Sequence, residues 1–326
     1  MQNLVHVVGG SRREFLKTSS LFIGAAAVSA AVPTVLLGQA GPSDEEKIAA
    51  IRRQITTAGV KLVPVGGNVS MITGAGGNIG VITGLEGKVL IDAGVSTTAP
   101  DVLKTLAQID AQPLKYLLNT HWHFDHTEGN EALHQAGATI VAHTRTRDRL
   151  AVSTFMDIVK IHFPASPAAA LPTRTLTDAF TFYMGGEEIT LQHVPPAHTD
   201  TDLYVHLKNA NVIHAGDLFF NGNYPLIDYS TGGNVNGFLD GIGKVLALAD
   251  DQTKIIPGHG PLANKADLKA AHDMLATIRD RVAASKQAGK SLADTIAGKP
   301  SAEFDAKWGK GMIGGDGIVT VIYNTL

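Results

Sequence analysis

The segment at residues 119–130, NTHWHFDHTEGN, places four proton- and metal-binding side chains within six positions: His121, His123, Asp125 and His126. A buried imidazole or carboxylate must find a polar partner, because otherwise its burial costs free energy. A core strand cannot supply that many partners by itself, and a surface loop has no need of such a cluster. Any fold that contains this segment must therefore bring further polar groups, or a cation, to the same place.

The residues around this segment predict strands that alternate with helices. Short β-branched segments separated by Gly and Asn between residues 61 and 94 are typical of consecutive hairpins. Helices are expected at 100–109, 130–135 and 238–248, and strands at 115–120 and 139–143, followed by a second group of strands between 180 and 217 and another at KIIPGHG, 254–260. Two successive halves, each a sheet followed by helices, predict a layered α/β sandwich.

The flanking segments predict helices outside this sandwich. Acidic residues early and basic residues late favour a short helix at 44–57, and 266–288 has the pattern of an amphipathic helix. The last segment, 317–326, favours a strand by its β-branched content, but a terminal packing helix fits it as well. The expected division is an N-terminal helix and linker at 41–60, a catalytic domain at 61–264 and a helical extension at 265–326 that packs on the same domain.

The first forty residues predict an export signal. Residues 11–17, SRREFLK, resemble the twin-arginine signal by which bacteria export folded proteins, and an apolar segment at 21–37 precedes small residues at 38–40. A membrane anchor is the alternative, but Pro33 interrupts the apolar run, which is about as short as a bilayer-spanning helix can be. We therefore expect cleavage after residue 40, the twin-arginine export machinery as a partner of the precursor, a periplasmic location and no stable membrane anchor.

Composition excludes several classes of site. The formal net charge of −3 and the absence of any run of five or more Lys and Arg residues argue against nucleic-acid binding. The chain contains no cysteine, which excludes disulfides, thiolate metal ligands and a cysteine nucleophile. A metal in this protein must therefore bind nitrogen and oxygen ligands.

Three further candidate ligands stand at expected strand ends. His198 precedes the strand LYVHLK, Asp217 ends the strand NVIHAGD, and His259 follows KIIP in a glycine-rich turn. In α/β folds, binding and catalytic residues are often found at such positions, at the edge of a sheet. If residues 119–123 finish an extended strand, His121 and His123 project to the same side of it, and the two ligands that follow lie on a bend before a helix at Thr127.

The motif His-x-His-x-Asp-His, with its three distant partners in this order, resembles the metallo-β-lactamase superfamily over about residues 62–262. The resemblance implies a four-layer αββα sandwich with two metals, usually zinc, at one edge of the paired sheets. Iron or manganese is also compatible with these ligand types. The implied ligands are, for the first metal, His121, His123 and His198; for the second metal, Asp125, His126 and His259; and for both metals, Asp217.

Two such cations, about 3.5–4 Å apart, would lower the pKa of a bridging water molecule. The resulting hydroxide can attack a carbonyl carbon while one metal stabilises the oxyanion. Asp125 has a second oxygen that can orient the hydroxide and take its proton, so it is the predicted catalytic residue. The sequence therefore predicts a dinuclear metallo-hydrolase that acts on a small molecule.

The residues near the motif bear on the substrate, which the fold alone does not decide. Many zinc β-lactamases carry a cysteine where this chain has Asp217, and the aspartate is similar to that of glyoxalase II thioesterases and lactonases. Acyl-homoserine lactonases carry a tyrosine where this chain has Phe220, and the tail lacks a recognisable glutathione-binding motif. These features favour an ester, thioester or lactone as substrate, together with a weak β-lactamase activity.

Two alternatives stay open. A periplasmic metallo-β-lactamase would meet antibiotics before they reach the cytoplasm. A mononuclear iron persulfide dioxygenase would share four of the ligands, although the intact second set favours two metals. A binding protein without catalysis would require a missing ligand, and the motif lacks none.

Other polar or irregular segments have weaker interpretations. Thr199 and Asp200 are interpreted either as partners that orient metal ligands or as parts of an ordinary turn. The segment 163–175 is either a surface loop or the border of a substrate cleft, and the glycine-rich segment 73–78 is expected to be a flexible hairpin tip that could cover the site. The remaining histidines are expected to pack in the protein or face solvent.

Overall fold

The computed structural model describes residues 41–326, and residues 42–326 form one compact unit. The predicted export signal at 1–40 lies outside the described residues. Among the helices at 41–326, none is long and apolar enough to cross a membrane.

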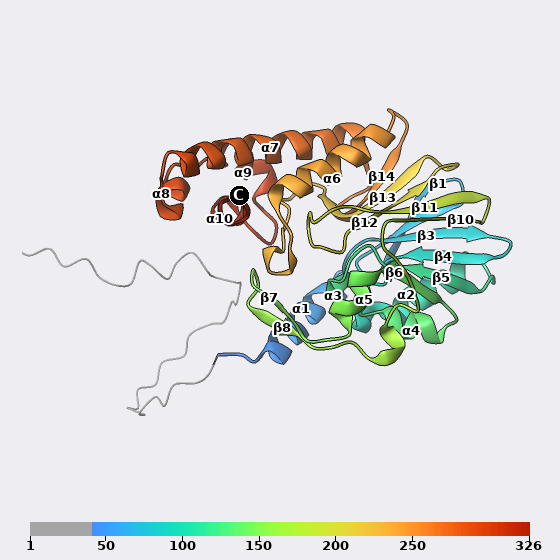
Figure 1. The fold of residues 1–326 in the computed structure, drawn as a ribbon. Coiled ribbons are helices and arrows are strands. Elements are labelled where there is room, and N and C mark those ends of the chain that lie inside the picture. The colour runs from blue at the N-terminus through green and yellow to red at the C-terminus, as the bar shows by residue number, and fades with distance from the viewer. Residues whose placement is uncertain (1–40) are drawn as a thin grey trace, which may run out of the picture. The chain divides into compact units, whose positions relative to one another are not determined.

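A seven-stranded sheet forms the N-terminal half of this unit (Figure 1). Its first four strands pair in antiparallel fashion, as the hairpin prediction requires, and the last four run parallel to one another. In spatial order the strands are β1 (Lys61–Gly66), β2 (Val69–Thr73), β3 (Ile79–Gly84), β4 (Gly87–Ile91), β5 (Leu114–Leu118), β6 (Thr139–His143) and β9 (Arg174–Leu176).

A six-stranded sheet forms the second half. Its first four strands pair in antiparallel fashion, whereas β13 and β14 are parallel. In spatial order the strands are β10 (Ala179–Met184), β11 (Glu187–His193), β12 (Leu203–Leu207), β13 (Val212–Phe220), β14 (Lys254–His259) and β15 (Ala263–Asn264). A separate hairpin consists of β7 (Thr154–Met156) and β8 (Ile161–Phe163).

The helices lie between and beyond these strands. Capping boxes begin two of them: Ser43 and Glu46 at α1, and Asn264 and Asp267 at α7. The α-helices are α1 (Asp44–Thr56), α2 (Ala99–Ile109), α3 (Phe124–Thr127), α4 (Asn130–Gln135), α5 (Thr144–Leu150), α6 (Val235–Leu248), α7 (Lys265–Gln287), α8 (Leu292–Ala297), α9 (Ala302–Trp308) and α10 (Gly315–Thr325). Short 3₁₀ helices are η1 (Ser96–Thr98), η2 (Ala168–Ala170) and η3 (Tyr229–Thr231).

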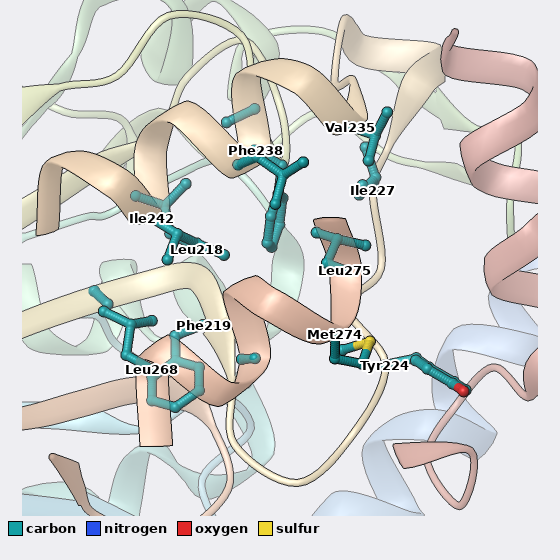
Figure 2. Packing of buried hydrophobic residues seen from close by; sticks show 14 of the residues in the cluster. Leu218, Phe219, Tyr224, Ile227, Val235, Phe238, Ile242, Leu268, Met274 and Leu275 are labelled. Atoms are coloured by element: carbon teal, nitrogen blue, oxygen red, sulfur yellow. The ribbon is translucent and has the colours of Figure 1, made fainter. Parts of the chain in front are cut away.

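Three apolar clusters join these elements into four layers. Residues of β2, β4 and β5 pack against β11, β12 and β14 between the two sheets. Residues of α2 and α4 cover the outer face of the first sheet. Residues of α6, α7 and α10 cover the outer face of the second sheet, where Phe238, Ile242 and Leu268 are among the packed side chains (Figure 2). Because each large apolar side chain contributes about 1.5–3 kcal/mol on burial, these clusters hold the predicted αββα sandwich together.

The C-terminal segment 317–326 is helical. Ile318, Val319 and Ile322 are fully buried at a spacing that places them on one side of α10, against α6 and α7. Packing of this apolar side outweighs the β-branched composition, which had left a strand open.

Two details near the cluster at 119–130 differ from prediction. β5 ends at Leu118, and residues 119–123 are a loop instead of the end of an extended strand. The helix predicted to begin at Thr127 begins at Phe124. Thr120 is held within this loop from two sides: its N–H donates to Asp92 Oδ1 at 2.7 Å, and its carbonyl accepts from Leu203 N at 2.7 Å.

Candidate metal centre

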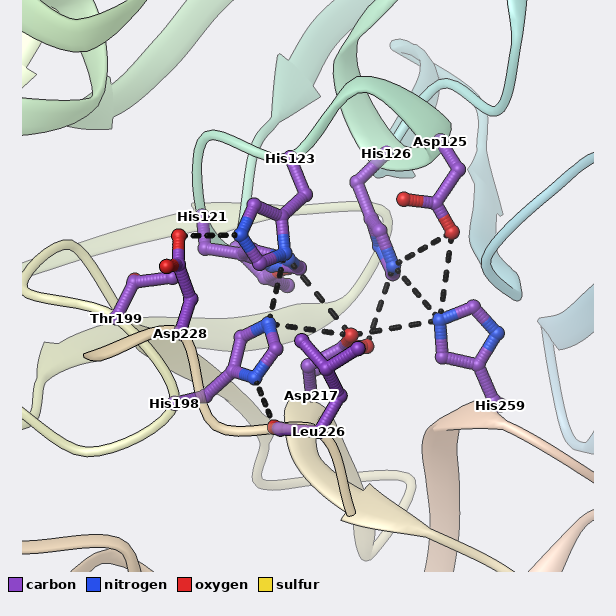
Figure 3. Close-up of polar contacts among 12 residues, drawn as sticks. His121, His123, Asp125, His126, His198, Thr199, Asp217, Leu226, Asp228 and His259 are labelled. Atoms are coloured by element: carbon purple, nitrogen blue, oxygen red, sulfur yellow. Dashed lines mark hydrogen bonds and ion pairs between the residues drawn. The ribbon is translucent and has the colours of Figure 1, made fainter. Parts of the chain in front are cut away.

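The candidate ligands come from one edge of the two sheets, where parallel strands end. The loop after β5 and the helix α3 provide four of them, and the end of β14 provides His259. Asp217 lies within β13, which continues to Phe220 beyond the predicted end of that strand. His198 lies in the loop before β12. Figure 3 shows these side chains directed toward a common centre.

The first set of ligand atoms belongs to His121, His123, His198 and Asp217. One atom from each of these residues lies within 4.8 Å of the others. His198 Nε2 lies 2.9 Å from His123 Nδ1 and 3.3 Å from Asp217 Oδ2. The three imidazoles are almost inaccessible, with side-chain exposures of 1%, 5% and 0% in sequence order.

The second set consists of Asp125, His126 and His259, whose ligand atoms also lie within 4.8 Å of one another. Asp125 Oδ2 lies 3.7 Å from His126 Nε2 and 3.4 Å from His259 Nε2. Unlike the first set, this one reaches solvent, since the side chain of Asp125 is 16% exposed and that of His259 is 29% exposed.

Asp217 lies between the two sets. Its Oδ1 is 3.2 Å from His126 Nε2, and its Oδ2 is 3.4 Å from His259 Nε2, while the same Oδ2 faces His198. A carboxylate in this position can bind two cations at once, which is the role that the family resemblance implies for Asp217.

The ring nitrogens that face away from the centre have hydrogen-bond partners, and these fix the direction of each imidazole. His123 Nε2 donates to Asp228 Oδ2 at 3.2 Å, and His126 Nδ1 donates to Asp92 Oδ2 at 2.8 Å. His198 Nδ1 donates to the carbonyl of Leu226 at 2.6 Å. With the hydrogen on the outer nitrogen, the inner nitrogen keeps its lone pair for a metal.

Sequence reasoning missed these partners. Asp228 and the Leu226 carbonyl belong to the segment 221–231, which follows β13 and has no motif of its own. Asp92 had a faint signal, because its IDAG context is typical of a strand end. The structure adds that its φ is 68°, which is unusual for a residue other than glycine.

The segment 221–231 is anchored by the C-terminal helices. Tyr224 is buried, its N–H donates to the carbonyl of Trp308 at 2.8 Å, and its hydroxyl donates to Asp305 Oδ1 at 2.7 Å. Both partners lie in α9. The helices after residue 265 therefore support the segment that orients His123 and His198.

Two glycines allow the backbone to approach the ligands closely. A Cβ atom on Gly77 would lie 2.1 Å from His126 Cε1, and one on Gly258 would lie 1.9 Å from Asp217 Oδ1. The segment 73–78 joins β2 and β3 as the predicted hairpin tip, but the flexibility expected of it does not fit its contacts: Ala75 and Asn78 are buried, and the Gly77 N–H donates to the carbonyl of Asp125 at 2.9 Å. The tip is a fixed support for α3.

The carboxylates of the cluster favour positive charge on the imidazoles that face them. Burial favours neutral His126, but the carboxylates of Asp217, Asp125 and Asp92 outweigh it and hold the pKa of His126 well above its ordinary value. Burial lowers the pKa of His121, and the neighbouring His126 lowers it further. Burial also favours neutral His259, but Asp217 and Asp125 outweigh it and raise the pKa of that imidazole above its ordinary value.

The donor set fits a pair of divalent cations. His121 Nε2 and Asp217 Oδ1 are buried, and neither has a hydrogen-bond partner among the described residues. Buried polar atoms in proteins are normally paired, and both of these point into the cluster. Five imidazoles and two carboxylates are donors that suit zinc, and they also suit iron or manganese.

The remaining sequence expectations are settled by their contacts. Thr199 and Asp200 do not orient ligands, because Thr199 Oγ1 donates to Asp202 and Asp200 pairs with Arg149 and Arg145. Of the other histidines, His143 and His193 stack on each other, with ring centroids 4.0 Å apart, and His214 is buried against Asn78. Residues 163–170 border a separate cavity that contains none of the seven candidate ligands.

The family model of the metallo-beta-lactamase superfamily matches residues 72–259, which is more than half of the 326-residue chain. The chain belongs to this superfamily. The matched segment contains all seven candidate ligands, and the outer partners Asp92 and Asp228 also lie within it.

The chain is also similar to two proteins named as hydroxyacylglutathione hydrolases. The one from Polaromonas sp. is 27% identical over 194 residues, which is 54% of this chain and 64% of the relative. The one from Pelagibacter ubique is 25% identical over 162 residues, 49% of this chain and 57% of the relative. The matches thus span less than two thirds of either relative, and the similarity supports a hydrolase without defining its substrate.

Solved structures show the same fold. A metallo-beta-lactamase from Pontibacter korlensis aligns with a TM-score of 0.53 and 21% identity, and the alignment covers 66% of this chain and 98% of that one. The stereoselective inverting sec-alkylsulfatase Pisa1 from Pseudomonas sp. aligns with a TM-score of 0.61 and 18% identity, and covers 81% of this chain and 50% of that one. At these identities, the similarity to the two solved structures shows a shared fold alone.

Proposed function

We propose that this superfamily hydrolase binds two metal ions and cleaves an ester, a thioester or a lactone. The observation that carries the proposal is the position of Asp217, whose two oxygens face both ligand sets. A protein that held one cation would not need the second set, which is complete.

The residues that would hold the cations divide as the sequence suggested: His121, His123 and His198 for one, Asp125, His126 and His259 for the other, and Asp217 for both. Bound there, zinc would supply a water molecule of lowered pKa and a positive charge that stabilises the oxyanion of the substrate. The rest of the chemistry falls to the protein's own side chains.

Asp125 is proposed as the catalytic carboxylate. Its Oδ2 faces the second set, while its Oδ1 has no hydrogen bond or ion pair among residues 41–326. This free oxygen can orient an attacking water molecule and accept its proton. The partial exposure of Asp125 allows a substrate to reach it.

Two features support the substrate class, and a third favours an ester or a thioester over a lactone within it. The shared ligand is an aspartate in a chain without cysteine, and the two curated relatives are named as hydrolases of a hydroxyacyl group on glutathione. Phe220 stacks on His259, with ring centroids 5.0 Å apart, so the wall next to the centre is apolar where a hydroxyl could have contacted a lactone. Hydrolysis of β-lactams remains a second candidate, because the predicted export signal would place the enzyme where it meets antibiotics before the cytoplasm does.

The test is a hydrolysis panel on the zinc-loaded protein, with an aryl ester, a simple thioester, a lactone and nitrocefin. We expect about two metals per chain and turnover of an ester, thioester or lactone faster than nitrocefin, with Asp125→Asn as the matched inactive control. Faster turnover of nitrocefin would favour the β-lactamase alternative. About one iron per chain, with sulfite formed from a persulfide, would overturn the hydrolase proposal.

We also propose that the chain is exported by the twin-arginine machinery and acts in the periplasm. The proposal rests on the sequence SRREFLK at 11–17. Replacing Arg12 and Arg13 by lysine is expected to retain the uncleaved precursor in the cytoplasm. Unchanged export of that variant would contradict the proposal.

A further inference from the structure

A cavity of about 190 Å³ lies behind α3, on the side away from the candidate ligands. Residues three and four apart in a helix share a face, so Phe124, Thr127 and Glu128 line this cavity. Asp125 and His126 lie on the opposite side of α3. Figure 1 shows α1, α3, α5 and the β7–β8 hairpin gathered around this region.

Aromatic rings form one part of the cavity wall. Phe124 and Phe163 stack with ring centroids 4.9 Å apart and an interplanar angle of 20°. Trp122 meets Phe163 edge to face at 6.2 Å. An engineered apolar cavity of about 150 Å³ binds benzene, so this one has room for a single six-membered ring with a short substituent.

The formal charges at the wall balance, with Arg52 and Arg149 against Glu128 and Glu131, but one of these four groups lacks a partner. Arg52 donates to both oxygens of Glu128, at 2.6 and 2.9 Å. Arg149 donates to both oxygens of Asp200, at 3.0 and 2.8 Å. Both guanidinium groups at the wall are thus paired with carboxylates, whereas Glu131 has no ion pair or hydrogen bond from its side chain among residues 41–326.

We propose that this cavity binds a small organic ammonium ion, with an aromatic or compact apolar body among Trp122, Phe124 and Phe163 and the charged nitrogen directed to Glu131. Aromatic rings attract cations as well as apolar groups, and an unpaired carboxylate adds the charge complementarity that a neutral or anionic ligand would lack. No feature of the metal centre is needed for this binding, so the proposal stands apart from the proposed hydrolase activity.

Tryptophan fluorescence provides a direct reading of the cavity. The chain has two tryptophans, and Trp308→Phe leaves Trp122 as the sole reporter. The metal-loaded Trp308→Phe protein is titrated with benzylammonium, benzyl alcohol and benzoate, which share one ring and differ in charge. Calorimetric titration of the same three probes into the unaltered protein checks that the substitution does not create the signal.

We expect benzylammonium to bind at least about fivefold more tightly than benzyl alcohol, and benzoate more weakly than either when read at Trp122. Glu131→Gln should remove this preference and leave the affinity for benzyl alcohol unchanged. Asp251→Asn, which removes an exposed carboxylate from the turn before β14, is the charge-matched control and should retain the preference. Equal binding of the three probes, no binding of benzylammonium, or a preference that survives in Glu131→Gln would overturn the proposal.

Discussion

The two ligand sets of the candidate metal centre differ in their contact with solvent. The imidazoles of the first set are buried from solvent, and their outer nitrogens make hydrogen bonds with a backbone carbonyl and with polar side chains. Two members of the second set are exposed, at 16% for Asp125 and 29% for His259. The difference indicates that the two sets have different roles: the first would hold a buried cation, and the second would hold a cation that substrate and solvent can reach.

The largest expected effect comes from removing a ligand of either set. His123→Ala and Asp125→Asn should each reduce hydrolysis by more than about 100-fold, beyond the 10–100-fold range typical of an outer partner. Far-ultraviolet circular dichroism should show that the fold is intact. Unchanged rates in metal-loaded variants would refute the assignment of these residues.

The next effect concerns the order of metal loss. Because the second set is open to solvent, a chelator should remove one metal per chain quickly and the other at least about tenfold more slowly. Metal content measured over time checks this. His259→Ala should abolish the fast phase of metal loss, and His198→Ala should abolish the slow phase. The reverse pattern would mean that the first set, and not the second, releases its metal quickly.

The outer carboxylates should act unequally on the two sets. Asp228→Asn is expected to weaken the first metal by about 10–100-fold, because Asp228 orients His123. Asp92→Asn is expected to weaken the second metal more than the first, because Asp92 contacts His126 directly and reaches His121 only through the hydroxyl of Thr120. Competitive chelator titrations of the two variants measure both affinities. Equal weakening of both metals in either variant would mean that the sets are not independent.

A smaller effect is expected at Tyr224. Tyr224→Phe removes the hydrogen bond to Asp305, which should cost about 0.5–1.5 kcal/mol of folding stability. The affinity for the first metal should fall by a few fold at most, and that for the second should not change. A loss of stability with both affinities unaltered would show that the anchor supports the fold alone.

The smallest expected effect is a pH dependence of stability that arises outside the metal centre, at the stacked histidines His143 and His193. Burial and the stacked His143 lower the pKa of His193 to about 4, from an ordinary value of 6.5. The unfolded chain therefore takes up the proton first, and this contribution to stability is lost as the pH falls from about 6.5 to about 4. Urea unfolding at several pH values should show that the free energy of unfolding declines less with falling pH in His193→Gln than in the unaltered protein. An identical decline would exclude the His143–His193 pair as a source of this pH dependence.

All seven candidate ligands were accessible to sequence reasoning because their identities and spacings carry information along the chain. The groups that orient them were not. Leu226 contributes a carbonyl, which any residue could supply, and Asp228 lies more than a hundred positions from the histidine that it orients. The extended conformation predicted for 119–123 failed for a related reason, since Asp92 and Leu203 bend that loop through contacts distant in sequence.

The anchoring of Tyr224 by α9 also bears on what counts as the functional unit. A chain cut after His259 would keep every candidate ligand and every residue that the family model matches. It would lose Asp305 and Trp308, and with them the support of the segment that directs His123 and His198. An inventory of candidate ligands can therefore be complete in a fragment that lacks the support for two of them.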